Sequence, residues 1–288
     1  MQTAKPLQIH RNIRLVSQHD AKPFGLDAFY TDDNSAKPVV LFVHGFNGFK
    51  DWGHWELTAR NFAEAGFVFV KFNLSHNGTS IENPKKFVDP EAYGHDFYTT
   101  DLDDIDQVIN YLHSEECPFG AAMNLDKLYL VGHSRGGGLV LIKTAEDDRV
   151  KAVTTWASIG DTRFFWKENR LNDLEQHGVT YYVNGRTKEK LPLYQAYYDN
   201  LLEHAERLDL KRAIQAIKVP ILLTHGDKDE AVAVEVAHQL QAWQPKAELF
   251  IIEGAMHTFG GYEPYDKDEL MPLMQRNVDK TIAFFQQL

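Results

Sequence analysis

The chain is poor in cysteine and methionine and has no long apolar segment. Cys117 is its single cysteine, so an intrachain disulfide and a cysteine metal cluster are both excluded. Five methionines and no low-complexity tract argue against a flexible, adaptable binding surface. No window approaches the roughly 20 apolar residues of a membrane span, and the polar first 20 residues do not resemble a signal peptide. We therefore expect a soluble, cytoplasmic protein without a membrane partner.

Positive charge is also scarce. The sequence has 30 Lys and Arg against 41 Asp and Glu, a formal net charge of −11. Because phosphate binding needs a concentrated positive field, nucleic acid is not expected as a partner. The hydrophobic fraction of 43% and the aromatic fraction of 12% are ample for a globular core. At 288 residues the chain is long enough for one large α/β domain or two small ones.

Apolar runs alternate with amphipathic stretches along most of the chain. The runs expected to form buried strands lie at 39–43, 67–72, 127–131, 150–156, 220–224 and 248–252. The stretches expected to be helical lie at 55–65, 102–112, 134–145, 232–243 and toward residue 288. Two earlier segments, 13–17 and 24–30, are expected to pair as antiparallel strands. This order predicts an α/β fold with a mostly parallel central sheet flanked by helices.

Three carboxylates crowd the start of one expected helix. Asp101, Asp103 and Asp104 follow Thr100, the expected N-cap. They suggest a metal site, but the helix dipole alone favours carboxylates in a first turn, and we prefer that interpretation. The thirteen histidines form no pair at metal spacing beside a carboxylate. We therefore expect neither a metal nor another cofactor.

The alternation breaks between residues 161 and 215. We expect a core of residues 1–160 and 216–288, and a cap formed by 161–215 over the strand ends, after the sixth strand. A structural excursion or an interface is the alternative. The Asn184-Gly185 pair predicts a hairpin, and 193–208 is expected to be helical. The segment is rich in aromatic residues, which suggests an apolar or aryl acyl group; the candidate substrate-binding residues are Trp166, Tyr181 and Tyr182.

A serine stands between two glycines at the end of an expected strand. The chain reads VGHSRGG at 131–137, directly after an apolar run and before an expected helix. One interpretation is a tight turn with an incidental serine. The other is a G-x-S-x-G nucleophile elbow, which requires this strand–turn–helix context. We favour the elbow, with Ser134 as the nucleophile.

A serine nucleophile needs a base and a group that orients the base. His257 lies in a loop five residues after the last expected strand, and we identify it as the base. The stretch THGDKDEAV follows the strand after the interruption and offers two carboxylates. We choose Asp229, which lies further along that loop, and keep Asp227 as the alternative. The order serine, acid, histidine is that of α/β-hydrolases.

Backbone donors for a developing oxyanion are expected at two places. The stretch HGFNGFKDW follows the strand at 39–43 and supplies the N–H of Phe46. The second donor is the N–H of Arg135, the residue after the nucleophile. Gly45 and Gly48 would let the backbone approach the substrate closely.

These motifs together resemble the α/β-hydrolase superfamily. HGFNGFKDW, VGHSRGG, THGDKDEAV and EGAMHTF stand in the expected order over residues 38–288. The chain is most similar to the dienelactone-hydrolase-like and feruloyl or cinnamoyl esterase-like branch. That resemblance implies Ser134, Asp229 and His257 as a triad and favours Asp229 over Asp227. Dienelactone hydrolases carry a cysteine nucleophile where this chain has serine, and FNLSHNGTS stands where relatives often have a G-x-G turn.

The sequence thus predicts a serine hydrolase of the carboxylesterase type, acting on a small-molecule ester through an acyl-enzyme. A serine peptidase or amidase with the same residues is the first alternative. A non-catalytic binding protein of the same fold is the second, although such a protein would be expected to have lost a triad member. The substrate and the oligomeric state stay open.

Overall fold

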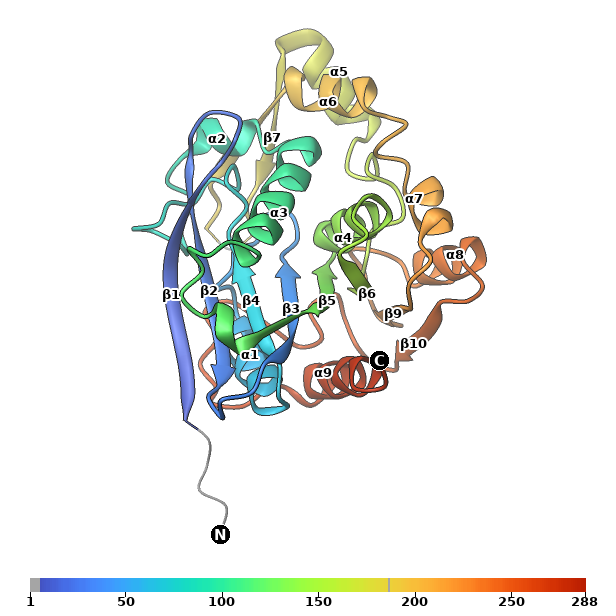
Figure 1. The fold of residues 1–288 in the computed structure, drawn as a ribbon. Helices are drawn as coiled ribbons and strands as arrows, with labels where there is room; N and C mark the ends of the chain where they lie inside the picture. The colour runs from blue at the N-terminus through green and yellow to red at the C-terminus, as the bar shows by residue number, and fades with distance from the viewer. Residues whose placement is uncertain (1–5, 186) are drawn as a thin grey trace.

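The computed structural model describes residues 6–185 and 187–288. Within these residues, eight strands form one sheet in the order β1-β2-β4-β3-β5-β6-β9-β10. Their bounds are β1 Leu7–Val16, β2 Pro23–Thr31, β3 Lys37–Val43, β4 Val68–Phe72, β5 Met123–His133, β6 Val150–Trp156, β9 Ile221–Gly226 and β10 Glu248–Ile252. Strand β2 pairs antiparallel with β1 and with β4, and the remaining pairs are parallel. The predicted mostly parallel sheet with an antiparallel N-terminal pair is confirmed (Figure 1).

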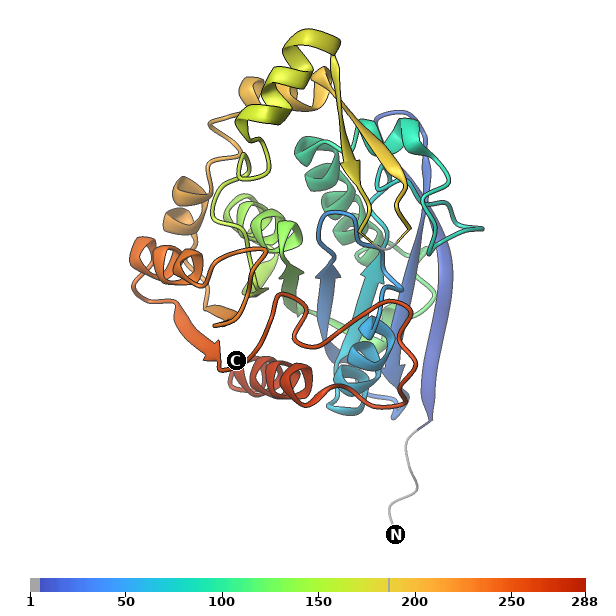
Figure 2. The same ribbon diagram turned by 180° about the vertical axis from the view of Figure 1, so that it is seen from behind.

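Helices cover both faces of this sheet (Figures 1 and 2). The longer ones are α1 Trp55–Glu64, α3 Tyr98–Leu112, α4 Arg135–Glu146, α8 Glu235–Trp243 and α9 Pro272–Phe285. Shorter ones are α2 Pro90–Gly94, α7 Leu210–Ala216 and the 3-10 turn Gly120–Ala122. Side chains alternate along each strand, so Val40 and Phe42 pack with α1 and α9, whereas Val39 and Leu41 pack with α3 and α4. No helix among the described residues is long and apolar enough to cross a membrane.

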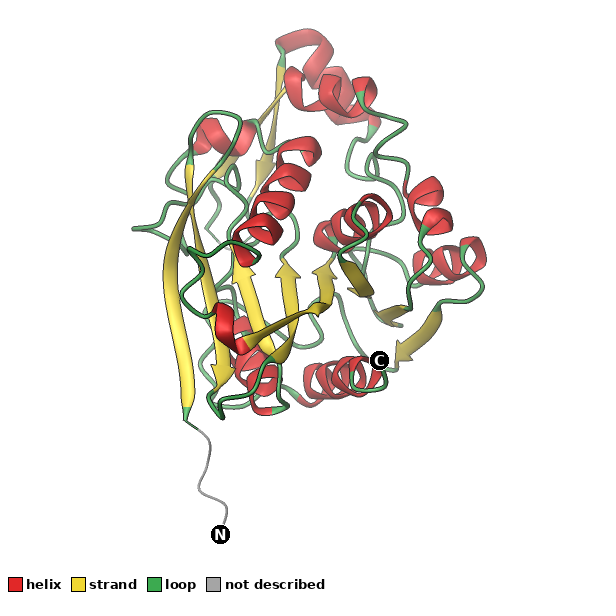
Figure 3. Ribbon diagram, in the orientation of Figure 1, coloured by secondary structure: helices red, strands yellow, loops and turns green. Residues whose placement is uncertain are grey.

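The segment between β6 and β9 stands above the end of the sheet (Figure 3). It contains α5 Glu168–His177, the strands β7 Val179–Val183 and β8 Lys190–Tyr194, and α6 Gln195–Glu203. The hairpin predicted around Asn184-Gly185 is confirmed by the antiparallel pairing of β7 with β8. The expected helix over 193–208 is shorter, because Leu193 and Tyr194 belong to β8.

Helix α7 belongs with the core rather than with the expected cap. It packs against α4 and α8 on one face of the sheet (Figure 1). The segment above the sheet therefore ends before Leu210, earlier than the boundary at 215 that the sequence suggested. We call the described residues of 161–209 the insert.

Two of the carboxylates near the start of α3 are buried. The helix begins at Tyr98, so Thr100 is not its N-cap. Asp101 lies in the first turn and Asp104 in the next, and both are buried among core residues. The Ser75 N–H donates to Asp104 at 2.7 Å. The helix-dipole interpretation thus accounts for the position of Asp101 but not for the burial of the Asp101 and Asp104 side chains. In the described part of the chain, no group of three or more His, Cys, Asp or Glu side chains is arranged to hold a metal ion.

We expect Asp104→Asn to change the pH dependence of stability. Burial raises the pKa of Asp104 to about 7, although hydrogen bonds from Ser75 lower it. Because an unfolded aspartate has a pKa near 4, the folded state holds an extra proton between these values. The stability from this proton is complete below about pH 4 and is lost as the pH rises through 7. The free energy of unfolding of the variant, relative to that of the wild type, should therefore rise by about 3 kcal/mol between pH 5 and pH 8.

Urea unfolding of both proteins at several pH values measures this gain. Asp126→Asn is the control for the loss of one carboxylate, because Asp126 is exposed. The same pH dependence of stability in both variants would contradict the prediction for Asp104→Asn.

Candidate active site

The stretch that the sequence singled out forms a sharp turn between β5 and α4. Ser134 occupies it with φ 56° and ψ −119°, a conformation that non-glycine residues adopt only under strain. The flanking glycines make the turn possible: a Cβ on Gly132 would lie 2.2 Å from the Gly136 carbonyl oxygen. A Cβ on Gly136 would lie 2.2 Å from the Val43 carbonyl oxygen. The strain at Ser134 favours a serine held for its hydroxyl over an incidental turn residue.

Three side chains predicted to act together lie in one hydrogen-bonded row. His257 Nε2 is 2.9 Å from Ser134 Oγ, and His257 Nδ1 is 2.7 Å from Asp229 Oδ2. They come from the turn after β5, the loop after β9 and the loop after β10, which meet at one edge of the parallel sheet. Asp227, the alternative acid, instead accepts the Gly254 N–H at 2.6 Å.

The surroundings of Asp229 keep its carboxylate ionised. Burial would raise its pKa, but hydrogen bonds from His225 and His257, with the Val232 N–H, hold the pKa well below its usual range. Asp229 Oδ1 accepts the N–H groups of Ala231 and Val232 at 2.9 Å each. An ionised acceptor at this position favours a proton on His257 Nδ1 and leaves Nε2 free to accept the Ser134 hydroxyl proton.

Two further histidines, which are not predicted from the sequence as site residues, support this row. His225 Nε2 lies 2.8 Å from the Val232 carbonyl oxygen and 3.2 Å from Asp229 Oδ2. His133, the last residue of β5, donates from Nε2 to the His257 carbonyl oxygen at 2.9 Å. Burial lowers the pKa of His133 to about 3, so its ring is neutral. The only signal in the sequence was that each stands at the end of a buried strand.

The residues predicted to supply oxyanion donors flank Ser134. Arg135 is the first residue of α4, where the helix itself offers the N–H no acceptor. The loop with Phe46 follows β3 and comes so close that a Cβ on Gly45 would lie 2.9 Å from the Ser134 Cβ. Phe46 lines the same cavity as Ser134.

That cavity has a volume of about 270 Å³ and aromatic walls. Ser134 and His257 line it together with Phe46, Trp52, Trp55 and Tyr182. Of the three aromatic residues predicted to bind substrate, only Tyr182 is among its lining residues within the described chain.

The other two predicted substrate residues lie elsewhere. Alternation along β7 turns Tyr181 away from Tyr182, and 51% of its surface is exposed. Trp166 is buried inside the insert against Tyr197 and Tyr198, with ring centres 5.3 Å apart in both pairs. The aromatic content of the segment therefore serves its own packing at Trp166, and neither Trp166 nor Tyr181 is among the residues that line the cavity beside Ser134.

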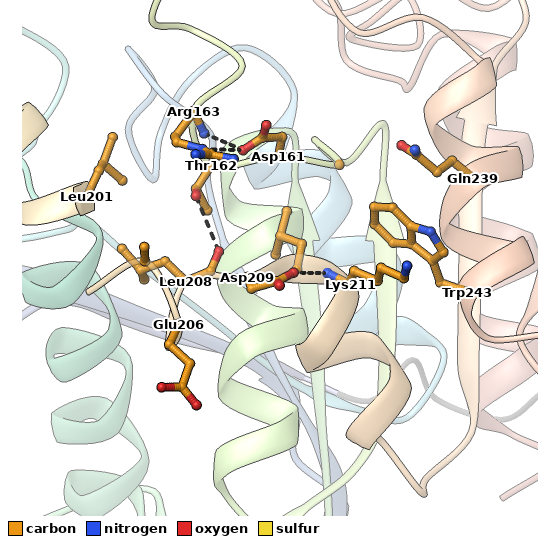
Figure 4. Close-up of a pocket in the computed structure, with 13 residues that line it drawn as sticks. Asp161, Thr162, Arg163, Leu201, Glu206, Leu208, Asp209, Lys211, Gln239 and Trp243 are labelled. Atoms are coloured by element: carbon orange, nitrogen blue, oxygen red, sulfur yellow. Dashed lines mark hydrogen bonds and ion pairs between the residues drawn. The ribbon is translucent and has the colours of Figure 1, made fainter. Parts of the chain in front are cut away.

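A larger cavity, of about 620 Å³, lies between the insert, α7 and α8 (Figure 4). Its lining residues among those described include Asp161, Arg163, Lys211 and Trp243, and none of Ser134, Asp229 and His257. Asp161 and Arg163 are more than half exposed and pair with each other. The smaller cavity, which Ser134 and His257 line, is therefore the candidate active site.

Comparisons with known proteins agree on the fold. Residues 38–178 match the family described as alpha/beta hydrolase fold. The chain is 22% identical to a Mycoplasma pneumoniae protein assigned provisionally as esterase/lipase 2, over 83% of this chain and 91% of that protein. Among solved structures, Est1E from Butyrivibrio proteoclasticus with bound ferulic acid superposes with a TM-score of 0.69 at 18% identity, covering 95% of this chain and 98% of that chain. The structure of PA2218 from Pseudomonas aeruginosa gives a TM-score of 0.64 at 18% identity, covering 100% and 95%.

Proposed function

We propose that the chain, whose residues 38–178 match the alpha/beta hydrolase fold family, is a serine hydrolase that cleaves carboxylic esters through an acyl-enzyme. The observation that carries the proposal is the row Ser134–His257–Asp229, with contacts of 2.9 and 2.7 Å, at the wall of a cavity. The esterase assignment of a curated relative supports the same reaction class.

In the proposed reaction, Ser134 Oγ attacks the ester carbonyl carbon while His257 Nε2 takes its proton. The N–H groups of Phe46 and Arg135 stabilise the oxyanion that forms. When the C–O bond breaks, His257 returns the proton to the leaving alcohol. Water then attacks the acyl-enzyme while His257 takes a proton from it, and His257 passes this proton to Ser134 Oγ as the acyl C–O bond breaks and the acid is released. Asp229 holds the imidazole in the required tautomer throughout.

We assign an apolar or aryl acyl group to the substrate. Phe46, Trp52, Trp55 and Tyr182 give the cavity beside Ser134 an aromatic lining, and such linings suit apolar ligands. Its volume of about 270 Å³ suits a small acyl group better than a long chain. The bound ferulic acid of Est1E, a structural neighbour, is consistent with this assignment.

Matched 4-nitrophenyl esters and 4-nitroanilides of acetic, butyric, octanoic and phenylacetic acid test the function. We expect turnover of the esters, fastest with the short and aryl acyl groups, and at least about 100-fold slower turnover of each anilide, because amines leave less readily. A fluorophosphonate should label Ser134, as mass spectrometry of the peptide would show. Anilides cleaved as fast as esters would indicate a peptidase or amidase. No turnover and no label would favour a non-catalytic protein.

A further inference from the structure

The guanidinium group of Arg135 is buried directly behind the turn that holds Ser134. Arg135 is 1% exposed. Its Nη2 lies 2.5 Å from the Asp96 carbonyl oxygen, and the same nitrogen forms an ion pair with Asp101 at 2.5 Å. Nη1 donates to the Asp96 carboxylate. The side chain of the residue that follows the nucleophile is thus tied to the start of α3.

The same guanidinium also faces three aromatic rings. Its central carbon lies 4.4 Å from the centre of the Tyr98 ring, 5.6 Å from that of Tyr197 and 5.9 Å from that of Phe46. Such distances permit cation–π attraction. Tyr98 belongs to the core, Tyr197 to helix α6 of the insert, and Phe46 to the loop after β3.

Phe46 reaches the insert as well. Its ring centre is 4.9 Å from that of Phe165 and 5.2 Å from that of Tyr182. In Figure 2 the hairpin β7–β8 descends toward this loop, and Asn184 donates to Asn47 at 3.3 Å. Both residues whose backbone N–H groups are assigned to the oxyanion hole therefore place their side chains against the insert.

We propose that docking of the insert sets the geometry of the oxyanion hole, with the Arg135 side chain and Tyr197 as positioning residues. The inference rests on the proposed function, since it concerns the transition state of that reaction. A backbone N–H moves only when its residue moves, and displacements near 1 Å at a reacting centre are costly. The ion pairs hold the Arg135 guanidinium on the core side, and the Tyr197 ring packs against it on the insert side. Phe46 is confined in the same way between Arg135 and the insert.

Tyr197→Leu tests the inference, and Tyr198→Leu is the matched control. Both tyrosines lie on α6 and contact Trp166 at 5.3 Å, but only Tyr197 contacts Arg135. For Tyr197→Leu we expect kcat on a 4-nitrophenyl ester to fall roughly 10- to 100-fold, with KM within about threefold. Binding of an aryl trifluoromethyl ketone, which mimics the tetrahedral intermediate, should weaken by the same factor. Tyr198→Leu should change neither by more than about twofold.

Arg135→Lys is the second variant, because lysine keeps the charge but loses the planar fork that reaches Asp96 and Asp101. It should show the same selective loss in kcat and in ketone affinity. Near-UV circular dichroism of each variant checks its folding, and if Arg135→Lys does not fold, Tyr197→Leu alone decides.

Several results would overturn the inference. They are equal kcat values for Tyr197→Leu and Tyr198→Leu, a loss confined to KM, and a fall in kcat without weaker ketone binding. If the wild-type protein itself neither cleaves esters nor binds the ketone, the proposed function fails, and the inference fails with it. An active wild type with an unaffected Tyr197→Leu variant overturns the inference alone.

Discussion

Replacing Ser134 by alanine is expected to lower kcat for ester hydrolysis by roughly 10⁴- to 10⁶-fold, with KM changed by less than about threefold. The hydroxyl is the proposed nucleophile, and its contact with His257 Nε2, at 2.9 Å, is the path for its proton. Without it no acyl-enzyme can form, and only the oxyanion donors and the cavity are left to assist attack by water. Substrate binding should persist, since the aromatic walls of the cavity are unchanged.

Steady-state kinetics on the best 4-nitrophenyl ester measures this loss. Ser114→Ala is the control. Ser114 lies just beyond the end of α3, where its hydroxyl donates to the Tyr111 carbonyl oxygen, so the substitution should leave kcat unchanged. His257→Ala should cost nearly as much as Ser134→Ala, and the double variant little more, because residues that act as a unit are not additive. A Ser134→Ala enzyme that keeps a tenth of the wild-type kcat would remove Ser134 from the role of nucleophile.

Local sequence signals were sufficient for most of the sheet and for the turn at Ser134. An unbroken apolar run such as Val39–Val43 can be buried on both faces only between two layers of helices, which is where β3 lies. The glycines around Ser134 mark a turn with no room for side chains. The order of the motifs along the chain then brought three strand-end loops to one edge, because parallel strands share their carboxyl ends.

Contacts between distant segments could not be predicted in the same way. His133 meets the His257 carbonyl group across 124 positions, and nothing local to either residue signals that hydrogen bond. The sequence around Asp101 indicates only a helix-dipole carboxylate, because its ion-pair partner Arg135 comes 34 positions later. The aromatic residues of the insert had the right composition for a pocket, but composition does not tell which ring faces inward. Strand alternation turned Tyr182 toward the cavity and Tyr181 away from it.

Replacing Asp229, the residue preferred over Asp227 as the acid, is expected to have the second large effect on kcat, and the same replacement at Asp227 is the control. Asp229→Asn is expected to lower kcat by roughly 10⁴-fold, equivalent to about 5 kcal/mol of transition-state stabilisation. An amide in place of the carboxylate keeps the shape of the site, but its NH₂ group can donate to His257 Nδ1. That donation would favour the tautomer whose Nε2 carries the proton, and such an imidazole cannot accept from Ser134.

Asp227→Asn makes the same chemical change two residues earlier in the same loop. Its carboxylate accepts the Gly254 N–H at 2.6 Å, and an amide oxygen can accept that hydrogen bond equally well. We expect kcat within about threefold of the wild type, with both variants similar in KM. Equal losses in the two variants would show that the loop responds to any change of charge, and a larger loss at Asp227 would make it the acid. A large loss at Asp229 alone would mean that the 2.7 Å contact with His257 sets the tautomer on which the reaction depends.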